Sequence, residues 1–122
     1  GGKQMVTFVG AEYIIANSLI ALKKTKNRTN ISLSELNQLG IYIQQMSIEN
    51  DVDAVFLVSQ DQVTTAVFDF SDYFEYNAAE KVICIKKTKQ ITDLASRFVG
   101  YLPWEIMAFL VKTTNEFVKK SA

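Results

Sequence analysis

The spacing of apolar residues changes twice along this chain, and that change restricts the fold more than any other feature. Between residues 11 and 50 apolar residues recur every three or four positions, the period of an amphipathic helix. From 53 to 87, β-branched and aromatic residues gather in short runs typical of strands. From 89 to 119 the helical spacing returns. The order predicts an α+β fold in which a small antiparallel sheet packs against helices.

The helical regions also have recognisable ends. Ser32 and Glu35 match a capping box, in which the serine accepts from the N3 amide and the glutamate reaches back. Gly40 interrupts the apolar face that follows, either as a weak point inside one helix or as a turn between two shorter helices. The last helix is apolar over much of its circumference, which indicates deep burial or a dimer seam. We predict helices over about 11–24, 32–50, 89–99 and 103–119.

The strand-like runs predict a three-stranded antiparallel sheet. We expect strands at about 53–59, 62–70 and 81–87, the first two joined as a hairpin through residues 60–62. Alternation along the second run places Phe68 and Phe70 on its inward face. These two rings then belong to the core and need no ligand to explain them.

The length predicts one domain over 1–122, with Gly1-Gly2 as a candidate cloning remnant. Apolar residues make up 48% of the chain, enough for a packed core. The longest apolar runs are too short to span a bilayer, and no signal-peptide pattern is visible. We therefore expect a cytoplasmic protein that does not contact a membrane.

Histidine is absent from the sequence, and this absence excludes several kinds of chemistry. It removes the commonest general base, the usual zinc ligand and every Ser-His or Cys-His nucleophile. No acidic calcium loop and no glycine-rich phosphate loop is present, and the single cysteine, Cys84, is expected to be a core residue of a strand. We expect a non-enzyme without catalytic residues, bound metal or cofactor.

Charges are segregated along the chain although the formal net charge is zero. Residues 29–80 hold nine carboxylates and no Lys or Arg, whereas the segments before and after them carry net charges of +4 and +5. Either the acidic middle folds against the basic flanks, or the surface carries patches of opposite sign. The basic flanks supply the candidate nucleic-acid contacts, which are Lys23, Lys24, Lys26, Arg28, Lys86, Lys87 and Lys89.

The stretch ISLSELNQLGIYIQQMSIEND, followed by the expected hairpin, resembles a winged-helix DNA-binding domain. The resemblance places Gly40 at the helix–helix turn and makes 41–50 the recognition helix, where Gln44, Gln45 and Asn50 would face base edges. DNA binding needs cations to neutralise phosphates, but 41–50 and the candidate wing at 59–62 contain neither Lys nor Arg. This departure makes DNA binding the alternative hypothesis.

The stretch FDFSDYFEYN, residues 68–77, combines aromatic rings with carboxylates. Asp72 and Glu75 have the spacing of an N-cap and its N3 partner, which predicts a short helix at 73–79. Tyr73, Phe74 and Tyr76 cannot all face inward on such a helix, so at least one ring is a candidate protein-binding contact.

Trp104 has two interpretations. It packs the start of the last helix onto the core, or it is an exposed protein-binding hot spot. Together, these observations predict a non-enzymatic interaction or regulatory module that acts through protein–protein contacts as a homodimer. A DNA-binding regulator, of winged-helix-like type or using basic flanks 23–28 and 86–89, is the alternative.

Overall fold

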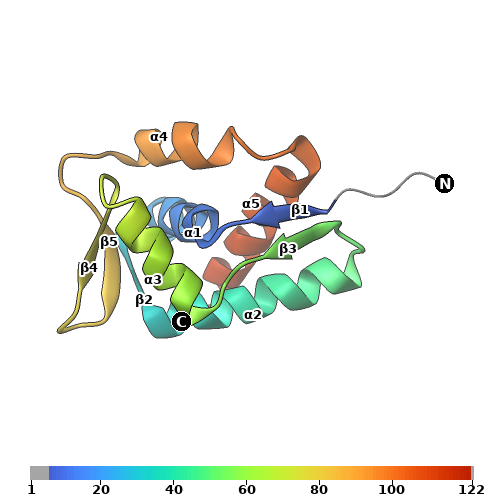
Figure 1. Ribbon diagram of the computed structural model, residues 1–122, viewed down its shortest axis with the longest axis horizontal. Coiled ribbons are helices and arrows are strands. Elements are labelled where there is room, and N and C mark those ends of the chain that lie inside the picture. Colours follow the sequence, from blue (N-terminus) through green and yellow to red (C-terminus); the bar gives the residue numbers. More distant parts are fainter. Residues whose placement is uncertain (1–5, 122) are drawn as a thin grey trace.

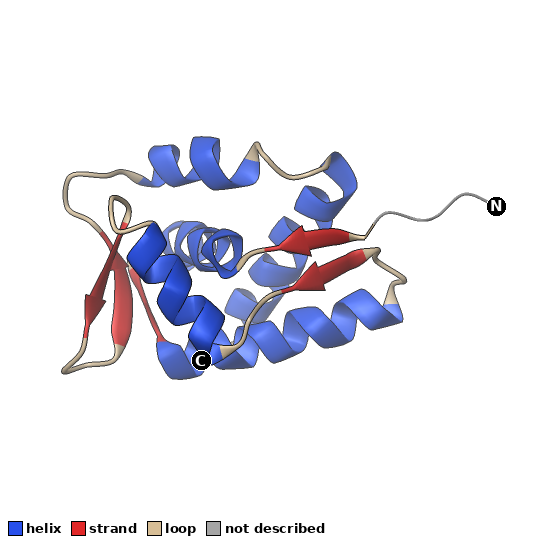
Figure 2. Ribbon diagram, in the orientation of Figure 1, coloured by secondary structure: helices blue, strands red, loops and turns tan. Residues whose placement is uncertain are grey.

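The computed structural model describes residues 6–121 and has an α+β fold (Figures 1 and 2). The helices are α1 (Ala11–Lys26), α2 (Leu33–Glu49), α3 (Gln60–Asp69), α4 (Ile91–Leu94) and α5 (Trp104–Lys120), and a π-helical turn, η1 (Ala95–Val99), continues α4. The strands are β1 (Thr7–Val9), β2 (Asn30–Ser32), β3 (Ala54–Phe56), β4 (Phe74–Asn77) and β5 (Val82–Ile85). Gly1-Gly2 lie outside the described residues.

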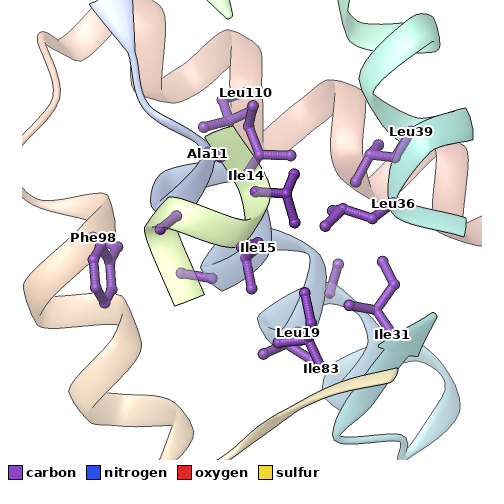
Figure 3. Close-up of a cluster of buried hydrophobic side chains, with 14 of the residues drawn as sticks. Ala11, Ile14, Ile15, Leu19, Ile31, Leu36, Leu39, Ile83, Phe98 and Leu110 are labelled. Atoms are coloured by element: carbon purple, nitrogen blue, oxygen red, sulfur yellow. The ribbon is translucent and has the colours of Figure 1, made fainter. Parts of the chain in front are cut away.

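Helix α1 forms the centre of the core, with the other helices and the two sheets around it (Figure 1). Its apolar stripe is fully buried, and Figure 3 shows side chains from α2, α5, η1 and the sheet converging on it. Helix α5 packs along α1, and their C-terminal ends meet where Lys26 donates to the carbonyl of Ser121. The labelled core residues are Ala11, Ile14, Ile15, Leu19, Ile31, Leu36, Leu39, Ile83, Phe98 and Leu110.

The strands form two separate small sheets. The first is antiparallel with the order β2-β5-β4, so β4 is an edge strand. The second contains β1 and β3 in parallel, with Phe8 opposite Val55. Figure 2 places the antiparallel sheet at one end of the molecule and the parallel pair near the other. The predicted class, a three-stranded antiparallel sheet packed with helices, is confirmed, but two of its strands are not the expected ones.

The predicted helices at 11–24, 32–50, 89–99 and 103–119 are confirmed, with their ends moved by a few residues. The capping box is formed, because Ser32 accepts from the amide of Glu35 and the Glu35 carboxylate accepts from the amide of Ser32. Gly40 lies inside α2 and is buried against Val58, so the interpretation of Gly40 as a turn is wrong. The candidate recognition helix at 41–50 is therefore the second half of one long helix.

Glu35 also pairs with Arg28, whose Nη2 donates to both carboxylate oxygens at 2.8 Å. Partial burial raises the pKa of Glu35, but the hydrogen bonds from Arg28 and Ser32 outweigh it and hold the pKa below the ordinary 4.5. A carboxylate with a lowered folded-state pKa stabilises the fold above its unfolded pKa, and loses that contribution as pH falls through the folded value.

We therefore expect Glu35→Gln to destabilise the protein at neutral pH, and the difference from wild type to shrink as pH falls below 4.5. Urea unfolding over a pH series measures this difference. Glu49→Gln, at the exposed far end of the same helix, is the control. A difference for Glu35→Gln that stays constant with pH would contradict the assigned ion pair.

The predicted hairpin of 53–59 and 62–70 is wrong. Residues 54–56 form the short strand β3, which pairs in parallel with β1, and residues 60–69 form helix α3. The helix begins because Ser59 accepts from the amide of Gln62 at its N-terminus. Its Val63 and Ala66 are buried against the core, so tertiary packing overrides the β-propensity of the run.

The predicted helix at 73–79 is also wrong, because residues 74–77 form strand β4 and pair with β5. The predicted inward strand face with Phe68 and Phe70 does not exist. Both residues end α3, where Phe68 is 80% exposed and Phe70 packs in part on the core. The third predicted strand, 81–87, is confirmed as β5 over residues 82–85 and occupies the centre of its sheet.

Candidate functional site

An apolar groove lies between helix α3 and the antiparallel sheet, and we name it the α3–β4 groove. It has a volume of about 390 Å³. One face of α3 forms its first wall, strands β4 and β5 form the second, and the first residue of α2 closes one side. Its lining residues are Leu33, Gln60, Val63, Thr64, Val67, Phe68, Ser71, Phe74, Tyr76 and Ile83.

A second hollow extends the groove along the start of α2. It has a volume of about 290 Å³ and shares Leu33, Gln60 and Val63 with the α3–β4 groove. Leu36 and Val58 add further apolar lining. The two hollows give an elongated apolar depression, whose shape suits a segment of polypeptide better than a single small ligand.

Two large apolar rings remain in solvent at this groove. Phe68 is 80% exposed at the end of α3, and Tyr76 is 45% exposed on β4. An exposed phenylalanine on the wall of an apolar groove leaves its hydrophobic surface in water, so covering it with a partner is favourable. These rings are the parts of the groove best suited to be binding hot spots.

The floor of the groove is fixed by a cluster of aromatic rings. Phe74 is buried and stacks on Phe98 with ring centroids 5.6 Å apart. Tyr73 meets the edge of Phe98 at 5.2 Å, and Lys89 lies over the Tyr73 ring. Because these packed rings leave Phe74 little freedom, the groove is formed before any partner arrives.

The segments that build the groove are acidic. Residues 60–80, which contain both α3 and β4, hold five carboxylates and no Lys or Arg. Lys81 follows at the end of the groove and lines the adjoining hollow. None of these carboxylates lines the groove, since Asp61 and Asp69 line a hollow on another face of α3 and Glu75 lines a hollow shared with Lys86. The net charge of residues 60–80 is negative, which favours a cationic partner over an anionic one at long range. The five carboxylates belong to Asp61, Asp69, Asp72, Glu75 and Glu80.

Cys84 lies in strand β5, as predicted, but it is half-buried instead of being a core residue. Partial burial raises the pKa of its thiol, and the carboxylates of Glu75 and Glu80 raise it further. A thiol whose pKa is raised is less often the reactive thiolate, which makes Cys84 a poor nucleophile. Among residues 6–121, no group of three or more side chains is placed to hold a metal ion.

The sequence-predicted protein-binding residues do not form one surface. Tyr76 is exposed and Phe74 is buried, both in the groove, while Tyr73 is half-buried against the core. The prediction that at least one of these rings is exposed is therefore confirmed by Tyr76. Trp104 is 73% exposed at the start of α5, so its interpretation as a core-packing residue is wrong.

The candidate nucleic-acid contacts are partly engaged within the fold. Arg28 pairs with Glu35, Lys26 donates to Ser121, and Lys23 donates to the side chain of Asn27. Strands β2 and β5 are antiparallel with Asn30 opposite Cys84, so Arg28 and the group Lys86, Lys87 and Lys89 leave the sheet at the same end. Lys24 is exposed on α1. None of these cations lines the α3–β4 groove.

Val63, Val67 and Phe68 line the groove, which the predicted strand at 62–70 does not indicate. A helical signal was present, because Ser59 precedes a polar turn and Val63, Ala66 and Val67 then follow at spacings of three and one. Leu33 and Ile83 come from distant parts of the chain, and no local pattern marks them as neighbours of α3.

Comparisons with protein-family models, with curated proteins and with solved structures found no match to this chain. Within residues 6–121, no helix combines the length and apolar character needed to cross a membrane. The site is therefore interpreted from its own geometry and charge.

Proposed function

We propose that this protein is a non-enzymatic interaction module that binds a cationic segment of a partner protein in the α3–β4 groove. The observation that carries the proposal is the exposed Phe68 on the wall of a preformed apolar groove. The net negative charge of residues 60–80 supplies long-range charge complementarity to Lys- and Arg-rich partners. The low reactivity expected of Cys84 and the absence of histidine from the sequence further favour binding over catalysis.

Selection from a random peptide display library on the immobilised protein tests this function. We expect enriched peptides to combine an aromatic or branched apolar residue with Lys or Arg. Phe68→Ser should weaken their binding by at least about tenfold, because truncating a central hot spot removes its buried contact. Trp104→Ser, which changes another exposed aromatic residue, is the control and should leave binding unchanged.

Two outcomes of this selection would contradict the proposed function. The first is no enrichment of peptides above an empty support. The second is a set of peptides that bind the Phe68→Ser variant as well as wild type. Peptides that lose binding only to Trp104→Ser would instead place the interaction at the start of α5.

The proposal includes self-association through the outer face of the β1–β3 sheet. Phe8 and Val55 are directly opposite each other, and Phe8 is 68% exposed. Parallel strands are usually covered on both faces, and the inner face here contacts α5 through Phe56 and Phe109. A second copy would cover the outer face in a twofold dimer. Light scattering should show a dimer that Phe8→Lys dissociates; a wild-type monomer at micromolar concentration would contradict this part.

Nucleic-acid binding is a second candidate function, favoured by one observation. The C-terminal ends of α1 and α5 meet, so their exposed lysines lie at one end of the molecule. These lysines are Lys23, Lys24, Lys119 and Lys120. A salt-titrated DNA-binding assay discriminates the two candidates, because phosphate contacts give affinity that falls steeply with salt. Binding at low salt that is lost with salt supports this candidate, and no binding at low salt excludes it.

A further inference from the structure

We infer that the free edge of strand β4 receives the partner segment as a fourth strand of the antiparallel sheet. This inference rests on the proposed function and specifies its binding mode. In strand addition, main-chain hydrogen bonds supply affinity and alternate side chains enter a pocket. Strand β4 is at the edge of its sheet (Figure 1). Its Phe74 and Tyr76 line the α3–β4 groove.

The hydrogen-bond pattern of the sheet shows which groups of β4 point away from β5. The amide of Lys86 donates to the carbonyl of Tyr73, which makes this directly opposite pair a hydrogen-bonded one. Such pairs alternate along an antiparallel ladder. Residues 75 and 77 therefore bond to β5, whereas the N–H and C=O groups of Phe74 and Tyr76 point to the free edge.

One of these edge groups already has a partner within the chain. The amide of Phe74 donates to the carbonyl of Phe70 at 3.1 Å. The carbonyl of Phe74 and both main-chain groups of Tyr76 remain on the open edge. A shallow hollow of about 540 Å³ lies over the outer face of β4 and β5, where its lining includes Glu75, Asn77, Cys84 and Lys86.

The edge lacks some of the features that usually prevent pairing. Natural edge strands are protected by proline, lysine, a bulge, short length or other charged residues, and of these β4 has only its short length and Glu75. Residues 74–77 are Phe-Glu-Tyr-Asn, and they pair with β5 in unbroken register. A helix bound in the groove would bury Phe68 but would not satisfy the edge groups of Tyr76. An added strand does both, and this is why we infer a strand.

The alternation of β4 predicts the chemistry of the added segment. The residue opposite Tyr76 would exchange two hydrogen bonds with it and direct its side chain to the groove face, beside Phe68. Its two neighbours would point to the outer face, where Glu75 lies on β4 opposite Cys84. Lys86 shares that face, but Glu75 is on the strand that the added segment would join, and its carboxylate favours a Lys or Arg beside it. The segment that fits has a large apolar residue between two basic residues.

A synthetic peptide with the sequence acetyl-Thr-Lys-Phe-Lys-Thr-amide is the probe for this inference. Methylating the backbone nitrogen of its Phe removes the donor to Tyr76 and should weaken binding by about fivefold or more, the value of one hydrogen bond. Methylating the nitrogen of the following Lys alters a group that points away from β4, and should leave affinity within about twofold. Isothermal titration measures both peptides on the unchanged protein.

Two variants of the protein test the same hydrogen bond by changing Tyr76 instead of the peptide. Tyr76→Pro and Tyr76→Ala both remove the ring, but only proline removes the edge N–H, which β5 does not use. We expect Tyr76→Pro to bind the peptide about fivefold more weakly than Tyr76→Ala. The thermal midpoints of both variants show whether each remains folded. The test with the methylated peptides uses the unchanged protein, so it stays valid even if Tyr76→Pro unfolds.

The outcomes separate this inference from the proposed function. Equal affinities for the two methylated peptides, combined with loss of binding in Phe68→Ser, would overturn strand addition but keep the groove as a binding site. No binding of the unmethylated peptide to wild type would also overturn strand addition. If the peptide library then yields no Phe68-dependent binder, the proposed function fails as well.

Discussion

Replacing Phe98 with alanine should lower the free energy of unfolding by about 3–5 kcal/mol, the usual cost of removing a buried aromatic side chain. Phe98 is fully buried and lies within 6 Å, centroid to centroid, of four other rings. These rings come from α1, the C-terminal end of α3, the turn before β4 and the first residue of β4. No neighbouring side chain can fill the resulting cavity without giving up its own contacts. The four rings belong to Tyr13, Phe70, Tyr73 and Phe74.

Chemical denaturation of the Phe98→Ala variant measures this loss. Phe68→Ala is the matched control, because it makes the same change at a side chain that is exposed to solvent. We expect the control to stay within about 0.5 kcal/mol of wild type. A loss below about 1 kcal/mol for Phe98→Ala would contradict the assignment of this ring to the core. Because Phe74 stacks on Phe98, the variant should also bind groove peptides less tightly.

Replacing Gly40 with alanine should destabilise the protein, although alanine is the better helix former by about 1 kcal/mol. A Cβ atom at position 40 would lie 2.8 Å from the Cβ of Val58 and 2.9 Å from its Cγ2. The Cβ of Val58 cannot rotate away because it is bonded to the main chain. Relieving such overpacking typically costs about 1–3 kcal/mol, which outweighs the gain in helix propensity.

Gly100→Ala is the control for Gly40→Ala. The nearest atom to a Cβ at position 100 is the carbonyl oxygen of Ser96 at 3.5 Å, an ordinary contact. The backbone there is right-handed helical, so alanine fits without strain. Denaturation midpoints should therefore fall for Gly40→Ala and be unchanged or raised for Gly100→Ala. A more stable Gly40→Ala variant would show that α2 and Val58 are not in close contact.

Helices α1, α2 and α5 could be predicted from sequence because their buried residues recur at helical spacing and their ends carry local signals. The capping box of Ser32 and Glu35 involves neighbours in the chain, and it formed as expected. The three-residue strands β1 and β2 could not be predicted, because each is defined by pairing with a segment far along the chain. Strands this short carry no periodic pattern of their own.

The sequence predicts a strand where helix α3 forms, because the run is rich in β-branched residues and its helix start signal is a single serine. Val63, Thr64, Thr65 and Val67 favour strands as isolated residues, but Ser59 caps a helix that buries Val63 and Ala66. Once α3 is a helix, residues 74–77 become free to pair with β5. The error in one element therefore displaced the whole predicted hairpin.

The candidate site could be predicted only in part. The acidic character of residues 29–80 and the exposure of one ring near Tyr76 were visible in the sequence. The groove itself depends on Leu33 and Ile83 lying beside α3, and tertiary packing alone determines this arrangement. Phe68 is an example. A strand at 62–70 would place its side chain in the core, whereas helix α3 leaves it exposed to solvent.

The most direct test of the α3–β4 groove is a map of amide chemical shifts on the nitrogen-15-labelled protein, titrated with acetyl-Thr-Lys-Phe-Lys-Thr-amide. The groove account predicts the largest shifts at Phe68, Ser71 and Tyr76, with little change at Phe8 and Trp104. Largest shifts at Phe8 or Trp104, or no shifts at the groove residues, would contradict it.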